Sequence, residues 1–289
     1  MIFSDVFSDV VEFFDEPRCY WDFPSSVIAF GESLKNSSLL SISTPTGYIF
    51  FRQGKTQLKL ITHFCEEFDL IETIVKLKNK GFSIKSLPFY GKEINNSLLV
   101  RAKTEYFTNK NWSIEEVKRN CSKNERKQIN HAFNRCKNKY YIEENLKLKE
   151  TLELVNKWIE EAEKRLNFKT GKPTHLMVRK GHHIKYIERY FKNSNNVILF
   201  GLRRRSDDTL FGISGFELFK GSAQFTIFKH LLGDHPFPKY MRILALQKAV
   251  ELIDENGKIY SGSSSDKSKS SLGLFPLKTY KIDCRKIGN

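Results

Sequence analysis

The sequence is poor in cysteine, and its few cysteines are scattered along the chain. They form no Cys-x-x-Cys pair, and they are Cys19, Cys65, Cys121, Cys136 and Cys284. An odd number at such wide spacings argues against a disulfide framework and against a zinc site. We therefore expect no metal, and we predict a reduced, cytoplasmic compartment for the chain.

Long apolar runs are also missing. The sequence has no run of about 18 or more apolar residues, so it predicts no transmembrane segment. Residues 1–11 contain Asp5 and Asp9 and no basic residue, unlike a secretory signal. Three catalytic patterns are absent as well: a Ser–His–Asp order, carboxylates at paired spacing, and a phosphate-binding P-loop.

Basic residues, by contrast, are abundant and unevenly distributed. The chain has 289 residues, a length that suits two domains of ordinary size, and a formal net charge of +15. Residues 1–110 hold 13 acidic and 13 basic side chains, whereas residues 111–289 hold 20 acidic and 35 basic ones. The net charge therefore lies entirely in the second part. This distribution favours a phosphate-bearing partner such as tRNA or DNA, with general solubility as the alternative explanation.

The first part of the sequence alternates short segments of strand and helix character, an α/β pattern. Turn residues at Thr44 to Gly47 separate two of the strands, and Gly81 closes the longer helix. The predicted elements are a helix at Ser25–Lys35, strands at Leu39–Ile42 and Tyr48–Arg52, a helix at Phe68–Lys80 and a strand at Ile84–Phe89.

After residue 110, helices come first and strands follow. Ser113 is the expected N-cap of a helix, with Glu116 as its capping-box partner. The helix predicted at Val117–Lys139 carries eight Lys or Arg residues and one acidic residue. The later predicted elements are helices at Leu148–Leu166 and Ile184–Asn193, strands at Val197–Arg203, Thr209–Phe219 and Ala223–His230, a helix at Lys239–Asp254, and strands at Lys258–Ser261 and Leu274–Ile282.

This order of elements is similar to that of the GNAT acyltransferase fold, and two local motifs strengthen the resemblance. The pattern K-x-x-R-x-x-I-x-x-A at Lys123–Ala132 resembles the basic helix of the Fem-type aminoacyltransferases and of the lysylphosphatidylglycerol synthetase C-terminal family. The segment Gly273–Lys278 resembles the G-L-x-x-F-K segment that closes those domains, with Leu277 in place of the usual phenylalanine.

The resemblance covers about residues 110–282, and it implies an α/β (α+β) fold. Members of these families commonly carry two GNAT-like units in tandem, each a mixed, mostly antiparallel sheet flanked by helices. We therefore expect a degenerate first unit at residues 1–109 and a complete transferase unit, which includes the basic helix, at residues 110–289. The resemblance also implies that the donor of the transferred group is an aminoacyl-tRNA.

A glycine-rich phosphate loop is missing from the second unit. GNAT enzymes that use acetyl-CoA usually place a Q/R-x-x-G-x-G/A loop before a helix, where amides and the helix N-terminus bind the pyrophosphate. The corresponding segment here is Leu232–Arg242, which has no paired glycines and contains Pro236 and Pro238. Proline has no amide donor. We therefore predict that acetyl-CoA is not bound and that no cofactor is held tightly.

Acyl transfer needs a cation for the tetrahedral oxyanion and groups that handle protons. The resemblance implies that Lys278 faces the reacting carbonyl or phosphate; the alternative is an ordinary surface lysine on the last strand. Asp234 is a candidate to orient or deprotonate an acceptor amine, or is simply a turn residue before two prolines. Tyr240 is a candidate proton donor to the leaving group, or is a packing residue.

Candidate phosphate contacts lie on the basic helix and in a serine-rich loop at Ser261–Ser271. Arginine binds phosphate through a bidentate fork and lysine binds it as a point charge. A solvated helix face and a plain surface loop are the alternative explanations. The candidates are Lys123, Arg126, Lys127, Arg135 and Lys267.

Three functions follow from these observations. The leading hypothesis is an acyltransferase of the GNAT superfamily that transfers an aminoacyl group from aminoacyl-tRNA to an amine or hydroxyl acceptor. A second hypothesis is a GNAT-like enzyme that modifies bases in DNA or RNA, as in phage DNA modification. A third is a GNAT-like protein that binds nucleic acid without catalysis.

Overall fold

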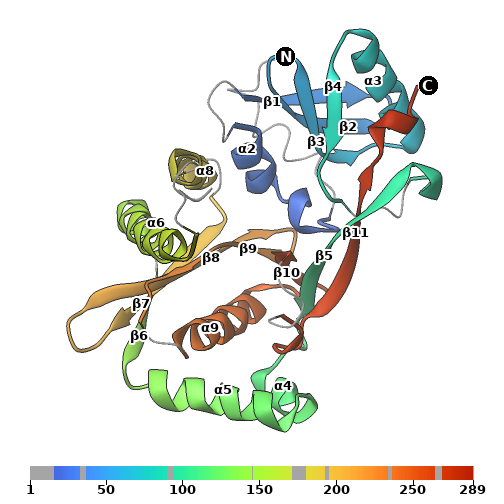
Figure 1. Cartoon of the computed structure of the whole chain (residues 1–289). Helices are drawn as coiled ribbons and strands as arrows, with labels where there is room; N and C mark the ends of the chain where they lie inside the picture. The colour runs from blue at the N-terminus through green and yellow to red at the C-terminus, as the bar shows by residue number, and fades with distance from the viewer. Residues whose placement is uncertain are drawn as a thin grey trace.

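Two β-sheets organise the chain (Figure 1). The computed structural model describes residues 16–32, 37–89, 94–144, 146–170, 180–192, 195–233, 236–263 and 269–288. The first sheet has four strands, which lie in the order β1 (Ser38–Thr44), β2 (Gly47–Gln53), β3 (Gln57–Phe64) and β4 (Ser83–Ser86). Its first three strands are antiparallel, and β4 runs parallel to β3.

The second sheet has seven strands and forms the larger part of the molecule. Its strands lie in the order β11 (Phe275–Ile282), β5 (Leu99–Asn109), β10 (Lys258–Ser263), β9 (Ser222–His230), β8 (Thr209–Phe219), β7 (Val197–Arg204) and β6 (Tyr140–Glu144). All neighbours are antiparallel except β9 and β10, which are parallel. The strands predicted between residues 197 and 282 are confirmed, whereas β3, β5 and β6 were not predicted.

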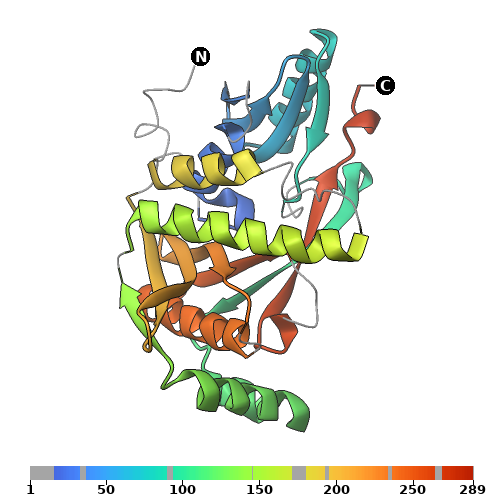
Figure 2. The ribbon, with the colours of Figure 1, turned by 60° about the vertical axis from the view of Figure 1, so that its left-hand side comes forward.

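Helices cover both faces of the second sheet (Figures 1 and 2). One face packs against α6 (Leu148–Thr170), and α8 (Lys180–Lys192) lies beside α6. The opposite face packs against α9 (Phe237–Leu252), and α5 (Lys123–Cys136) lies on the outer side of α9. The mixed class, with mostly antiparallel sheets flanked by helices, is therefore as predicted. Among the described residues, no helix has both the length and the apolar character needed to cross a membrane.

One predicted helix is two helices in the structure. The helix expected at Val117–Lys139 is divided into α4 (Ile114–Asn120) and α5. The division occurs because Ser122 starts a new helix as an N-cap, in a capping box with Glu125. Ser113 caps α4 and accepts a hydrogen bond from the Glu116 amide over 3.2 Å, as predicted.

The two sheets repeat one order of elements. In the first sheet, three antiparallel strands are followed by α3 (Glu67–Asn79) and the parallel strand β4. In the second, β7, β8 and β9 are followed by α9 and the parallel strand β10. This repetition is the tandem arrangement that the resemblance implies.

The last strand of the predicted first unit belongs to the second sheet. The expected boundary at residues 109 and 110 falls at the end of β5, which lies between β11 and β10. In addition, Phe89, just after β4, forms an isolated bridge with Tyr280 of β11. The two units are therefore joined by strand pairing, and the division of the chain at residue 109 stays a prediction.

Candidate functional site

A cavity opens in the second sheet where two parallel strands move apart. β9 and β10 pair only through Ile259 with Ala223 and Tyr260 with Gln224, after which they diverge. Between them lies a cavity of about 570 Å³. Its walls come from β9, β10, α9 and β5, together with Trp21 from the short 3-10 helix η1 (Tyr20–Asp22).

A buried lysine, Lys269, faces this cavity at the point where the chain turns toward β11. Its side chain is 4% exposed, and its Nζ donates hydrogen bonds to the carbonyl oxygens of Ser261 and Gly262 in β10. Burial, together with the positive charge of Arg242, lowers the pKa of Lys269 to about 7. Glu105 acts in the opposite direction on the same pKa. Near neutral pH, this amine therefore holds its proton only weakly.

Two more cations and one carboxylate complete the polar lining. Lys229 of β9 has its Nζ 3.9 Å from the centre of the Trp158 ring, and burial lowers its pKa to about 8. Arg242 of α9 lies over Phe228 at 4.7 Å, and burial lowers its pKa also. Glu105 of β5 is 3% exposed and is the one acidic residue among the described residues that line the cavity.

This balance of charge favours an anionic or carbonyl-bearing ligand. Three cations in a poorly solvated site raise the free energy of the folded protein unless negative charge is close to them. Among the described lining residues, the carboxylate of Glu105 supplies part of that charge. A phosphate or a developing oxyanion in the cavity would supply more, and the low local dielectric would strengthen the attraction.

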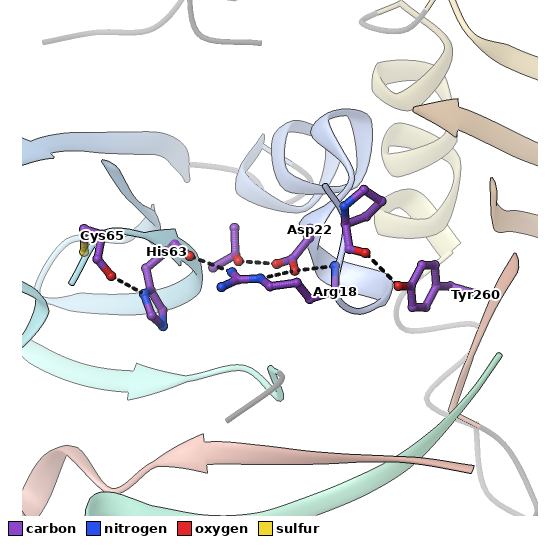
Figure 3. Close-up of polar contacts among 7 residues, drawn as sticks. Arg18, Asp22, His63, Cys65 and Tyr260 are labelled. Carbon is purple, nitrogen blue, oxygen red and sulfur yellow. Dashed lines mark hydrogen bonds and ion pairs between the residues drawn. The ribbon is translucent and has the colours of Figure 1, made fainter. Parts of the chain in front are cut away.

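Trp21 lies in the cavity wall, and a network of polar contacts holds the residues around it in the chain (Figure 3). The Tyr260 hydroxyl donates to the Pro17 carbonyl oxygen over 2.6 Å. Arg18 forms an ion pair with Asp22 at 3.0 Å and donates to the carbonyl oxygen of His63 at 2.8 Å. Asp22 also accepts a hydrogen bond from the Thr62 hydroxyl over 2.5 Å. Both sheets therefore fix the segment that carries Trp21.

The start of α9 offers few amide donors to a phosphate group. Pro236 occupies the N-cap without a side-chain cap, and Pro238 is the second residue of the helix. Phe237, between them, is fully buried in the core. This geometry agrees with the absence of a glycine-rich phosphate loop in the sequence, because prolines remove amide donors where such a loop provides them.

Two of the three predicted catalytic residues, Lys278 and Tyr240, do not line the cavity. Lys278 is exposed on β11, opposite Thr104 of β5, and does not line the cavity. Tyr240 is buried edge-on against Phe133 at 5.3 Å, and burial raises its pKa. Because Tyr240 and Arg242 are about 200° apart around α9, the helix directs them to different sides. Asp234 lies outside the described residues.

Four of the five predicted phosphate contacts lie along α5. Lys123, Lys127 and Arg135 are exposed. Arg126 is exposed too, but its Nε donates to the Lys118 carbonyl oxygen over 2.8 Å and so caps the end of α4. Lys267 lies outside the described residues. The binding roles of these residues stay predictions.

The residues that do meet in the cavity carry weak signals in the sequence. Lys269 lies two residues after the predicted Lys267, in the same serine-rich segment. Glu105 is a charged residue inside an otherwise strand-like segment, and Arg242 ends the segment that stands in place of a phosphate loop. Burial distinguishes these side chains from the many exposed cations, and burial depends on strand pairing between distant parts of the chain.

The comparisons with known proteins agree on the fold. No protein-family model matches the sequence, and no curated protein matches it either. Among solved structures, L-PGS from Bacillus licheniformis is similar, with 10% identity, a TM-score of 0.64, and coverage of 99% of this chain and 97% of that one. FemX is similar at 9% identity and a TM-score of 0.60, with 96% of each chain covered.

A third similar structure has the tandem arrangement in its name. The tandem GNAT protein from the clavulanic acid biosynthesis pathway matches at 8% identity and a TM-score of 0.51, with 97% of this chain and 95% of that chain covered. These identities are too low to carry an activity from one protein to another. They show that the chain shares a fold with these proteins, and the third of them is a tandem GNAT protein.

Proposed function

We propose that this chain is an acyltransferase that moves an aminoacyl group from an aminoacyl-tRNA to an amine or hydroxyl acceptor. The observation that carries the proposal is the cavity between β9 and β10, whose described lining residues include the cations Lys229, Arg242 and Lys269 and the carboxylate of Glu105. The similarity in fold to FemX and L-PGS supports a transferase. The donor is the one implied by the resemblance of the sequence to those families.

The reaction needs three tasks from the cavity residues. The acceptor nitrogen or oxygen attacks the ester carbonyl of the donor, so a new C–N or C–O bond forms and a tetrahedral oxyanion appears. Lys269, as an ammonium, donates to that oxyanion, with Arg242 as a second nearby cation. Glu105 accepts the proton that the acceptor loses. The ester C–O bond then breaks, and the tRNA ribose oxygen takes up the proton that Glu105 accepted, which restores the carboxylate.

The wall of the cavity suits a donor that does not depend on backbone amides to bind a diphosphate. Because Pro236 and Pro238 occupy the start of α9, that helix end has fewer amides to bind the pyrophosphate of acetyl-CoA. The proposal therefore excludes acetyl-CoA as the donor. A calorimetric titration is expected to give no binding of acetyl-CoA in the micromolar range.

The decisive assay compares donors directly. The full chain is incubated with tRNA charged with labelled amino acids, and with labelled acetyl-CoA in a parallel reaction, each with a panel of amines, peptides, lipids and hydroxylamine. We expect enzyme-dependent transfer of label from tRNA to an acceptor and none from acetyl-CoA. Transfer from acetyl-CoA alone contradicts the proposal, and label that appears on a nucleobase supports the base-modification hypothesis instead.

Two lysine variants then test the site. Lys269→Met is expected to lower the transfer rate by about 10²- to 10³-fold, the usual effect of removing an oxyanion donor. Lys278→Met, which changes an exposed lysine of β11, is the matched control and is expected to stay close to the wild-type rate. The reverse result would move the reaction from the cavity to the segment Gly273–Lys278.

A further inference from the structure

A second hollow, separate from the cavity, lies at the far end of the second sheet. It has a volume of about 900 Å³, and we call it the basic cleft. It is formed by the end of α5, the start of β6, the turn between β7 and β8, and the segment before α9. Its described lining residues include no acidic side chain, and its cations are Arg135, Lys139, Arg204 and Arg205.

Chain segments far apart in sequence bring these four cations together. Lys139 lies in the turn after α5, and its carbonyl oxygen accepts a hydrogen bond from the Arg205 amide over 2.8 Å. Arg204 lies opposite Tyr140 in the register of β6 and β7. A favourable interaction with the helix dipole would explain why a cation lies at Arg135, at the end of α5. It cannot explain why arginines also lie at the turn between β7 and β8.

The charge of the basic cleft is only partly balanced within the protein. Arg204 forms an ion pair with Asp207, with Nε 2.9 Å from Oδ1, and this pair lowers the pKa of Asp207 to about 2. Arg205 is exposed, and its guanidinium lies over the Tyr141 ring at 5.5 Å. Arg135 is exposed as well. Three of the four cations are arginines, whose planar forks match phosphate geometry.

The basic cleft also lies close to the cavity along the chain. Lys229 lines the cavity and Leu232 lines the cleft. Because only two residues lie between them in the chain, their Cα atoms are at most about 11 Å apart. A duplex whose backbone occupied the cleft would therefore hold a single-stranded end near the cavity.

We propose that the basic cleft binds the phosphodiester backbone of an RNA duplex, beside the cavity that receives its 3′ end. The choice of RNA rests on the proposed function, whereas the binding of phosphates rests on the four cations. This assignment places the main phosphate contacts at Arg135 and Arg205. It does not place them at Lys123 and Lys127, which lie at the other end of α5.

The test uses an RNA hairpin that has a single-stranded 3′ tail and carries no aminoacyl group. Its binding is measured by fluorescence anisotropy from about 50 to about 200 mM salt. The double variant Arg135→Gln/Arg205→Gln is expected to weaken binding at least tenfold. It is also expected to reduce the slope of log K against log salt by about 2, because each arginine that no longer pairs with a phosphate removes about one unit. Thermal unfolding of each variant verifies that the fold is kept.

Two double variants of equal charge serve as controls. Arg101→Gln/Lys281→Gln changes exposed residues of β5 and β11, at the opposite end of the sheet, and is expected to leave the slope unchanged. Lys123→Gln/Lys127→Gln tests the other end of α5. If this last variant loses binding while the cleft variant keeps it, the proposal is overturned.

Competitors decide the class of ligand. The RNA hairpin is expected to be displaced by other RNA duplexes and poorly displaced by polyglutamate of equal charge. Equal displacement by polyglutamate overturns the proposal in favour of an acidic protein, and tighter binding of a matched DNA duplex overturns the choice of RNA. Because the RNA probe carries no aminoacyl group, the assay measures binding without transfer. A failure of aminoacyl transfer would therefore contradict the proposed function without changing the result for the basic cleft.

Discussion

Tyr260 of β10 and Pro17, in the segment before η1, are joined by a buried hydrogen bond of 2.6 Å from the phenol to the carbonyl oxygen. Tyr260 is 1% exposed and lies at the last paired position before β10 leaves β9. The bond therefore links the opening of the sheet to the segment that places Trp21 in the cavity wall. The shape of the cavity depends on this contact.

The first prediction concerns that bond. Tyr260→Phe leaves the buried Pro17 carbonyl without its donor, which costs about 1–3 kcal/mol of unfolding free energy. Urea denaturation followed by tryptophan fluorescence measures the loss. Tyr280→Phe is the control, because the Tyr280 hydroxyl has no hydrogen bond with a described residue, and it is expected to change stability by less than about 0.5 kcal/mol. Equal losses in both variants would contradict the assignment.

The second prediction concerns the packing of α9 against β8. A Cβ atom on Gly212 would lie 2.6 Å from the Met241 sulfur and 2.7 Å from the Phe237 ring. Gly212→Ala must therefore displace α9 or force strained side-chain rotamers, at a cost of about 1–3 kcal/mol. Gly54→Ala meets only the Gln57 carbonyl oxygen, at 3.4 Å, and is the near-neutral control. Thermal unfolding of the two variants gives the comparison.

The third prediction is a dependence of stability on pH. Burial lowers the pKa of Lys269 from its ordinary value of 10.5 to about 7. Between these two values the unfolded chain binds a proton at this lysine that the folded chain does not, so raising the pH favours folding. Relative to Lys269→Met, the unfolding free energy of the wild type should therefore rise from pH 7 toward pH 10, by at most about 1.4 kcal/mol per pH unit. Parallel curves for the two proteins would show that Lys269 is not desolvated.

The fourth prediction concerns the base. Glu105→Gln keeps the size of a side chain that is buried in the cavity but removes its proton-accepting group. We expect kcat for aminoacyl transfer to fall by about 10²-fold or more, while binding of uncharged RNA is unchanged. Because the Glu105 charge raises the pKa of Lys269, the variant should also shift the alkaline limb of the pH–rate profile to lower pH. A normal kcat would assign proton transfer to another group.

The order of elements after residue 190 was predictable because each strand there has a clear apolar run with turn residues around it. The end of α4 was missed because the capping box at Ser122 lies inside a continuous basic segment. β5 was not predicted, although Arg101, Lys103 and Glu105 occupy alternate positions as on the polar face of a strand, and the sequence does not reveal that Glu105 is buried. The division between α4 and α5 is therefore encoded locally, whereas the burial of Glu105 depends on strand pairing.

The candidate site was less accessible to sequence reasoning than the fold. The resemblance directed attention to Lys278, which is exposed, whereas Lys269, nine residues earlier, is buried beside Glu105 and Arg242. Nothing in the local sequence separates these two lysines. Their difference comes from the divergence of β9 and β10, which depends on residues from distant parts of the chain.

The position of β5 limits how the chain can be divided. β5 precedes residue 110, yet it lies between β10 and β11 and supplies Glu105 to the cavity. A fragment that began at residue 110 would lack β5, so the backbone amides and carbonyls of β10 and β11 that pair with it would be left unpaired. It would also lack Glu105, the only carboxylate that the described residues bring to the cavity. The two halves are therefore not interchangeable modules, because recombination that exchanged either half would have to preserve β5 and its pairing with β10 and β11.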